Sequence, residues 1–565
     1  MWDRASDRCR TACHAPIVRA AIRQAAAALR DAMTNPGIRR LEIAWMLGIA
    51  ADVALFVVLL VVAYSRDGVV ATGLLGAFRM APAVLSGAGS GALLRRWSGR
   101  TILLAAAVVR TAVAILALLA IQGEAPTVVL LLLAAVGGGA GAVVRPIQAT
   151  LMPALARTPE ELVAANVAWG TVEGIGSLVG PAIAAGLIAA GLFAAVAGLA
   201  AVGFAASALA VLGLRFEQAA DDRAAAGSAM GVQLAEGIRA LRRRQVPRWS
   251  ILAVFGQTMT RGMLNALIVV ASIELLSLGD AGVGTLNALI GVGGLVGGLF
   301  TMSIVRPANL IGAGMVALAF WGLPIAVVGL VPRADVAIVA MAVIGVSNAA
   351  FDVAILTIFQ RGSSNEERGP VFAVFEAIAG LGVVVGSLLA PVLIDALGDR
   401  QAMVVAGAIL PIVAVVIYTR IGRIAAVSTV DETIVALLRR VPAFAALPLT
   451  AIERLAGAAR LERHPADAIL MEQGDVGDRF LVIETGDVDI RIDGRSVQRL
   501  GPGAGIGEVA LLRASPRTAT VVAVTDVRAV TIGAGDFCAA VSGPTALALM
   551  ERVVRERLAR TPAQT

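Results

Sequence analysis

The segment of the chain with the most evident chemistry is Gly505–Val521, which reads GIGEVALLRASPRTATV. Gly505 and Gly507 let the backbone approach a ligand closely, so the amides that follow them can point at an anion. Arg517 offers a guanidinium that grips phosphate through two parallel hydrogen bonds, and Glu508 offers an acceptor suited to a sugar hydroxyl. A phosphate and a sugar hydroxyl in one cradle indicate a nucleotide monophosphate. ATP is not indicated, because the usual P-loop Lys is absent.

The surrounding tail predicts a small domain that would position this segment. From about residue 437 an amphipathic helical stretch gives way to short alternating runs. We expect strands at 487–494, where Asp-Gly signals a hairpin turn, at 519–524 and at 527–532, and a closing helix at Pro544–Arg560. The economical interpretation is a small α+β domain over residues 438–560, a β-roll with flanking helices.

The segment closely resembles the phosphate-binding cassette of cyclic-nucleotide-binding domains. Two turns support the resemblance, EQGDVGD at Glu472–Asp478 and ETGDVDI at Glu484–Ile490. It implies cAMP or cGMP as a regulatory ligand, with Arg517 on the cyclic phosphate and Glu508 on the ribose 2′-hydroxyl. The residues implied to bind the nucleotide are Gly507, Glu508, Val509, Ala510, Arg517 and Thr518.

The resemblance leaves the base unassigned. Thr518 stands where a hydroxyl favours or tolerates cGMP in some family members. The aromatic side chains that often cap the base are absent from Pro544–Thr565, which leaves Met550, Arg552 and Arg555 as candidates. A domain that keeps the fold without binding nucleotide is the alternative.

The tail carries no pattern expected of an enzyme or of a metal site. The three Cys, at positions 9, 13 and 538, are too scattered for a disulfide framework, and His464 is the only His of the tail. We find no nucleophile–base pair. We therefore expect no catalytic residue, no metal and no enzymatic activity.

Composition places most of the chain in a membrane. Of its 565 residues 58% are apolar and 15% charged, with a mean hydropathy of +0.84. This apolar fraction exceeds what a soluble core can bury, so the excess must face lipid.

Twelve apolar runs are long enough, at about 20 residues, to cross a bilayer as helices. They divide into six and six at the Arg-rich loop 215–249. Fourteen Arg lie in the connections on the side of that loop against three on the other, so the positive-inside rule places both termini in the cytoplasm. The runs are 41–64, 69–94, 101–121, 127–152, 162–190, 192–214, 250–277, 281–303, 308–331, 335–359, 370–396 and 401–421.

The expected organisation follows from these boundaries. Topology explains the net charge of +7 better than a nucleic-acid partner does, and we expect none. The segments are a cytoplasmic N-terminal arm at 1–40 to which we assign no structure or function, helices one to six at 41–214, the basic loop at 215–249, helices seven to twelve at 250–423, a linker at 424–437 and the tail domain at 438–560.

An internal repeat links the two sets of six. GSLVGPAIAAGL at Gly176–Leu187 matches GSLLAPVLIDAL at Gly386–Leu397, as in duplicated transporters whose site lies between the halves. With this repeat, the 6+6 count and the basic central loop, residues 38–423 resemble the major facilitator superfamily. The run RPIQATLMPALARTPEELVAANVAWG at Arg145–Gly170 is similar to the branch that contains siderophore and macrolide exporters.

The resemblance extends to two gating motifs. GALLRRWSGR matches the loop motif between helices two and three, although Arg95 replaces the acidic residue of the family, and GxxxGP in the fifth run matches a motif associated with exporters. The residues concerned are Gly91, Arg95, Gly99 and Arg100 in the first motif and Gly176, Gly180 and Pro181 in the second.

Ionisable residues within the runs are candidates for transport, because a charge at bilayer depth costs at least about 2.5–3.5 kcal/mol and needs a partner or an aqueous cavity. Away from the helix ends four Arg stand against four carboxylates. They can be structural gating pairs, or Asp52 or Glu173 can titrate protons, with Asp52 favoured. The transport and proton-coupling candidates are Asp52, Glu173, Arg110, Arg145, Asp352 and Glu376, and the other two Arg are Arg79 and Arg261.

The sequence thus predicts a monomeric multi-pass protein of the bacterial inner membrane. We expect a secondary transporter, a proton-coupled antiporter for efflux of a small amphipathic compound of drug or siderophore type, regulated by cAMP or cGMP through its tail. Two alternatives stay open: a membrane-anchored nucleotide receptor that moves no solute, and a transporter whose tail binds no ligand.

Overall fold

The chain forms two compact units, Met1–Arg423 and Ile424–Thr565, which we describe separately. The computed structural model describes residues 30, 33–214, 230–243, 245–304, 310–362, 368–427, 432–441, 444, 447, 449–513, 515–541 and 551. The closing helix expected at Pro544–Arg560, with its candidates Met550, Arg552 and Arg555, lies almost wholly outside these residues.

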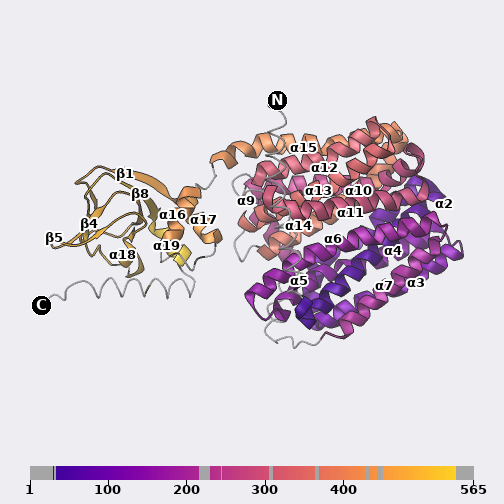
Figure 1. Ribbon diagram of the computed structural model, residues 1–565, viewed down its shortest axis with the longest axis horizontal. Coiled ribbons are helices and arrows are strands. Elements are labelled where there is room, and N and C mark those ends of the chain that lie inside the picture. The colour runs from indigo at the N-terminus through magenta and orange to yellow at the C-terminus, as the bar shows by residue number, and fades with distance from the viewer. Residues whose placement is uncertain are drawn as a thin grey trace, which may run out of the picture. The chain divides into compact units, whose positions relative to one another are not determined.

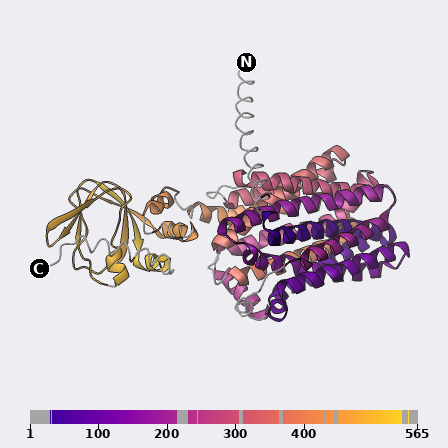
Figure 2. The same cartoon turned by 60° about the horizontal axis from the view of Figure 1, so that its bottom comes forward.

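The first unit is a bundle of long helices that run roughly parallel in both views of Figure 1 and Figure 2. Its first half consists of α2 (Pro36–Arg96), α3 (Gly99–Gln122), α4 (Thr127–Ala142), α5 (Val144–Leu155), α6 (Pro159–Ala189) and α7 (Phe193–Leu212). The second half consists of α9 (Met230–Arg243), α10 (Gln245–Val270), the π-helical turn η1 (Ala271–Leu275), α11 (Gly279–Ile304), α12 (Leu310–Leu330), α13 (Ala334–Gly362), α14 (Arg368–Leu397) and α15 (Asp399–Val427).

Within the described residues, eleven helices are long and apolar enough to cross a membrane, where the sequence predicts twelve runs. The difference lies in α2, which contains both the run 41–64 and the run 69–94. Its backbone departs from helical geometry at Asp67 and Gly68, where Gly68 has φ +69°, a value that glycine adopts without strain. Two helices joined at this kink therefore carry two of the predicted runs.

The first helix begins earlier than the sequence indicated. Residues 36–40, assigned to the N-terminal arm, form the first turns of α2, because the Asn35 side chain accepts hydrogen bonds from the amides of Gly37 and Ile38 and Pro36 occupies the first helical position. This start places Glu42 inside the helix rather than at its end.

In the described part of the second unit, eight strands form two antiparallel four-stranded sheets, ordered β1-β8-β3-β6 and β2-β7-β4-β5. The strands are β1 (Arg460–His464), β2 (Ile469–Met471), β3 (Arg479–Thr485), β4 (Val488–Ile492), β5 (Arg495–Leu500), β6 (Gly505–Ile506), β7 (Thr520–Ala523) and β8 (Val527–Gly533). The expected hairpin is confirmed: β4 pairs with β5 across Asp493 and Gly494, both at positive φ. The strands expected at 519–524 and 527–532 are β7 and β8.

Four helices accompany the sheets where the structure describes this unit: α16 (Glu432–Arg440), α17 (Leu449–Ala458), α18 (Glu508–Arg513) and α19 (Ala534–Val541). The aromatic rings of Phe444, Phe480 and Phe537 pack together with centroids 4.7–6.1 Å apart. All three side chains are fully buried. They join the helices to β3, the strand that pairs with the glycine-rich β6, and so fix the start of Gly505–Val521.

Candidate functional site

The start of the candidate cassette is a tight turn that only glycine fits. β6 ends at Ile506, Gly507 adopts φ +99°, and α18 begins at Glu508. A Cβ atom on Gly507 would lie 2.6 Å from Nη1 of Arg517 and 3.1 Å from the carbonyl oxygen of Arg479. Both the left-handed backbone and the close approach of Arg517 therefore require a glycine.

The Arg517 side chain is buried against this turn, and the residue is 5% exposed. Its Nη1 donates to the Gly507 carbonyl oxygen at 3.1 Å, and its Nη2 donates to the Arg479 carbonyl oxygen at 2.7 Å and to Oδ1 of Asp478 at 3.3 Å. Burial lowers the pKa of the guanidinium from its ordinary value, although an arginine keeps its charge at any physiological pH. The structure thus holds the Arg517 guanidinium in place beside the turn at Gly507.

The other predicted cassette residues differ in how far they are buried. Glu508 and Ala510 are buried, at 2% and 3% exposure, while Val509 is half-buried and Thr518 is exposed. A buried carboxylate acceptor and a buried guanidinium thus lie in one short stretch of chain. That combination suits a ligand with both a hydroxyl and an anionic group.

In the membrane unit, Asp52 lies between two guanidinium groups. Its Oδ2 pairs with Arg79, which belongs to the second half of α2, and its Oδ1 lies 2.5 Å from Arg110 of α3. The two cations also stack on aromatic rings, Arg79 on Phe56 at 4.4 Å and Arg110 on Phe204 at 4.2 Å. Three side chains with 10–25% exposure form an ion triad inside the first half of the bundle.

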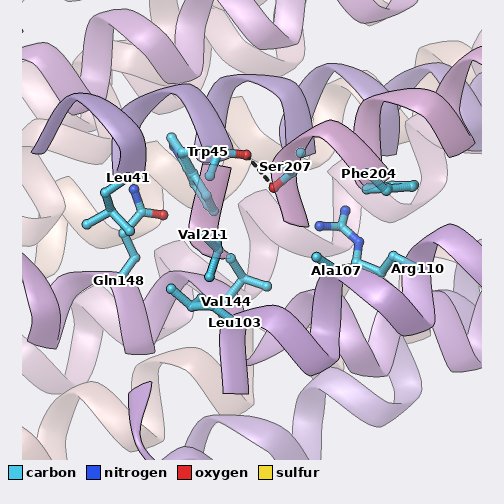
Figure 3. A pocket seen from close by; sticks show the side chains of 12 residues that line it. Leu41, Trp45, Leu103, Ala107, Arg110, Val144, Gln148, Phe204, Ser207 and Val211 are labelled. Carbon is cyan, nitrogen blue, oxygen red and sulfur yellow. Dashed lines mark hydrogen bonds between the residues drawn. The ribbon is translucent and has the colours of Figure 1, made fainter. Parts of the chain in front are cut away.

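A pocket adjoins this triad. It is lined by residues of α2, α3, α5 and α7, with Arg110 and Phe204 at one end and Leu41 and Gln148 at the other (Figure 3). The Ser207 hydroxyl donates to the carbonyl oxygen of Ala44 at 2.8 Å and joins two of these helices. The full lining is Leu41, Ala44, Trp45, Gly48, Leu103, Ala107, Arg110, Val144, Gln148, Phe204, Ser207 and Val211.

The remaining transport candidates form a second charged cluster, which joins the two halves. Arg145 of α5 pairs with Glu173 of α6 at 3.8 Å and interacts electrostatically with Glu376 of α14 and Asp352 of α13. Asp352 accepts a hydrogen bond from Asn348 at 2.8 Å and also lies in the field of Arg261. The structure therefore brings the first-half residues Arg145 and Glu173 together with acidic residues of the second half.

The glycines of the exporter-like motif are points of close backbone contact. A Cβ atom on Gly180 would collide with the carbonyl oxygen of Ala50, and one on Gly176 would lie 3.0 Å from that of Met46. The Pro181 carbonyl oxygen would lie 2.8 Å from a Cβ on Gly284 of α11. Helix α6 thus touches both α2 and α11 through backbone atoms.

In the loop motif, Gly99 begins α3 and Nη2 of Arg100 donates to the Leu212 carbonyl oxygen at 2.6 Å. A Cβ atom on Gly99 would lie 2.9 Å from the Leu151 side chain. Gly91 and Arg95 belong to α2, but the surroundings of these two residues lie outside what the structure describes.

Sequence reasoning missed Glu42, which is fully buried in α2. It stands in RRLEIAWML, one residue after the expected start of the first run. Only ionisable residues away from the helix ends are transport candidates by sequence, so Glu42 is not among them. The signal that could have found it is a single acidic residue followed at once by an unbroken apolar stretch. As for metals, no group of three or more candidate ligands occurs in the described part of the chain.

Comparison with known families agrees with this two-part organisation. Residues 43–369, more than half of the chain, match the model of the Major Facilitator Superfamily. The chain belongs to the major facilitator superfamily. Residues 461–542 of this facilitator match the model of the Cyclic nucleotide-binding domain, and the match contains the whole segment Gly505–Val521.

Curated relatives match the C-terminal unit of the facilitator. Its sequence is 36% identical over 99 residues to the cAMP-dependent protein kinase regulatory subunit of Candida albicans, which covers 18% of this chain and 22% of that one. It is 49% identical over 57 residues to the corresponding subunit of Eremothecium gossypii, covering 10% and 12%. The facilitator thus spans less than a quarter of the length of either relative.

Solved structures match the same region. The regulatory subunit of a cAMP-independent protein kinase A from Trypanosoma brucei is 22% identical, with a TM-score of 0.21, and covers 24% of this chain and 48% of that one. The regulatory domain of Toxoplasma gondii protein kinase A with cAMP is 20% identical, with a TM-score of 0.21 and coverages of 28% and 56%.

Proposed function

We propose that this facilitator is a secondary active transporter whose activity is set by cAMP or cGMP bound to its C-terminal unit. The observation that carries the proposal is the buried Arg517 guanidinium, hydrogen-bonded to the Gly507 carbonyl oxygen inside the matched nucleotide-binding domain. In the proposed complex the guanidinium exchanges its contact with Asp478 for the cyclic phosphate, while Glu508 accepts from the ribose hydroxyl. The backbone amides of Gly507 and Ala510 complete the cradle.

Calorimetric titration of the purified full chain with cAMP and with cGMP tests nucleotide binding. We expect saturable binding to one site per chain. Arg517→Ala should weaken it about 10- to 150-fold, because a hydrogen bond to a charged group contributes about 1.5–3 kcal/mol. Arg513→Ala is the matched control, since Arg513 has the same charge, lies four residues away and is exposed. Absence of binding to folded wild type favours a transporter with a non-binding tail.

Regulation requires more than binding. A nucleotide shifts the transport cycle only if it binds the C-terminal unit with different affinity in two states of the membrane unit. Transport into vesicles, measured with and without nucleotide, therefore separates a regulated transporter from a transporter that merely carries the domain. If the reconstituted chain binds nucleotide but moves no solute, the receptor alternative is correct.

For the transported compound we propose export of a small amphipathic molecule of drug or siderophore type. The support is the glycine-rich contact of α6 with α2 and α11, in the motif that resembles those of exporters, and a mixed charge cluster that joins both halves. We further propose that transport is coupled to protons and that the chain is a monomer in a bacterial inner membrane with both termini in the cytoplasm, as its distribution of Arg favours.

A further inference from the structure

Glu42 differs from Asp52 and Glu173, the acidic transport candidates of the first half of the bundle, because no ion pair or hydrogen bond among the described residues compensates its charge. The residue is 0% exposed, and neither carboxyl oxygen has a hydrogen-bond partner among the described residues. By contrast, Asp52 is paired with Arg79 and Arg110, and Glu173 with Arg145. An ionised carboxylate in such surroundings is far less stable than a neutral carboxyl.

The charges around Glu42 do not supply the missing cation. Among the described residues, Glu173 of α6 acts electrostatically on Glu42, and it has the same sign. Arg145 of α5 pairs with Glu173, Arg110 of α3 pairs with Asp52, and Arg40 of α2 donates to the carbonyl oxygen of Gly213. Arg39, three residues before Glu42 on α2, is exposed.

The other helices that pack on α2 bring no compensating charge to Glu42 among the described residues. α4 and α7 contain no charged residue. Within the described residues, no ion pair or hydrogen bond joins Glu42 to the charged side chains of α9, α10, α11 and α14, namely Glu236, Arg239, Arg242, Arg248, Arg261, Asp280, Glu376 and Asp395.

We propose that Glu42 is a proton-binding residue of the transport cycle. It holds a proton while buried between α2 and the helices around it, and it releases the proton when the bundle opens enough to admit water. In the release step the O–H bond of the carboxyl breaks, the electron pair stays on the carboxylate, and water accepts the proton. This inference rests on the proposed proton-coupled function and assigns the coupling to Glu42 instead of Asp52.

The position of Glu42 links its proton to the charge cluster between the halves. Once ionised, Glu42 repels Glu173, which is the ion-pair partner of Arg145. Because Arg145 also interacts with Asp352 and Glu376 of the second half, a change of charge at Glu42 alters the balance of attraction between the halves. Trp45, one turn later on α2, lines the pocket that ends at Arg110.

Infrared difference spectroscopy of the purified full chain in nanodiscs tests the proposal without any transported compound. A protonated carboxyl has a C=O stretching band above the amide I band, and this band shifts in deuterated water. We expect wild type at neutral pH to show such a band, and Glu42→Gln to lose one component of it. Glu274→Gln, an exposed glutamate that accepts from the Tyr64 hydroxyl, is the matched control and should leave the band unchanged.

The melting temperature shows whether Glu42→Gln is folded. Glutamine is a neutral isostere of a protonated glutamic acid, so Glu42→Gln should melt within a few degrees of wild type. The proposal is wrong if the carboxyl band is the same in folded wild type and Glu42→Gln, or if Glu42→Gln fails to fold. Because no transport is measured, these outcomes are independent of whether the chain moves a solute.

Discussion

The Arg517 guanidinium donates a hydrogen bond to the carbonyl oxygen of Gly507, ten residues earlier in the chain, at 3.1 Å. The bond joins the two ends of the cassette. Because this contact and those with Arg479 and Asp478 fix the Arg517 side chain, little further ordering of Arg517 opposes the proposed binding of a nucleotide. The arrangement depends on the missing Cβ of Gly507.

Replacement of Gly507 by alanine should damage both the fold and the nucleotide site. The added Cβ would lie 2.6 Å from Nη1 of Arg517, and the backbone has φ +99°. Gly494→Ala is the control, because Gly494 has φ +77° with no heavy atom within 4 Å of the new Cβ. We expect about 1–2 kcal/mol of destabilisation from the left-handed backbone alone in Gly494→Ala, and more in Gly507→Ala.

Calorimetry of the full chain and nucleotide titration check this pair. Gly507→Ala should weaken nucleotide binding, because the collision displaces Arg517, whereas Gly494→Ala should bind as wild type does. Equal affinity and equal stability for the two variants would show that the contact between Gly507 and Arg517 is unimportant.

Asp52→Asn should destabilise the membrane unit, because it leaves Arg79 and Arg110 without their shared anion. Breaking a buried ion pair on one side costs about 3–5 kcal/mol, and the 10–25% exposure of the three side chains places the expected loss at the lower end. Asp335→Asn removes a carboxylate from a pair whose side chains are 66–68% exposed and should change little. The thermal unfolding midpoint in detergent measures both, and a wild-type midpoint for Asp52→Asn would contradict a structural role for the triad.

Two glycines of α6 should respond oppositely to alanine. Gly180→Ala drives a Cβ into the carbonyl oxygen of Ala50, while Gly186→Ala meets no atom within 4 Å. Overpacking costs about 1–3 kcal/mol, whereas alanine is favoured over glycine within a helix by about 1 kcal/mol. We therefore expect Gly180→Ala to lower the melting temperature and Gly186→Ala to keep or raise it. The same shift in both variants would count against close contact of α6 with α2.

The hairpin of β4 and β5 should weaken in acid. Hydrogen bonds from the Ser496 hydroxyl at 2.6 Å and the Arg491 guanidinium at 2.8 Å lower the pKa of Asp489. Because the folded-state pKa lies below the unfolded value of about 3.9, this stabilisation is complete above about pH 4 and is lost as the pH falls through the folded-state pKa. Calorimetry from pH 6 downwards should show a steeper loss of stability in wild type than in Asp489→Asn; parallel curves would refute the linkage.

Local sequence signals predicted the parts of the structure that depend on neighbouring residues. The Asp-Gly turn, the strands at 519–524 and 527–532 and the glycine-rich turn before Glu508 all follow from short-range backbone preferences. Hydropathy located the membrane runs because it too depends only on residues that are neighbours in the chain. The start of the first helix shifted because a cap at Asn35 and a proline at the first position outweigh the lower hydropathy of residues 36–40.

The partners of the membrane charges could not be predicted in this way. Four arginines and four carboxylates can pair in many combinations, and only the packing of helices selects the triad around Asp52 and the cluster around Arg145. Burial also separates Glu42 from Asp52: both are carboxylates in one helix, yet α3 and the second half of α2 bring cations to Asp52 alone. Which helix faces which is a property of the whole bundle.

Helix α6 approaches main-chain atoms of α11 closely at two glycines. Cβ atoms on Gly284 and Gly291 of α11 would lie 2.8 Å from the Pro181 carbonyl oxygen and from Cα of Leu178 of α6. Interlocked side chains resist sliding because each must leave its groove, and Gly284 and Gly291 carry no side chain that would have to do so. At these glycines the two halves can therefore change their mutual tilt without first separating interlocked side chains. A larger residue at either glycine would hinder this movement while leaving each half folded.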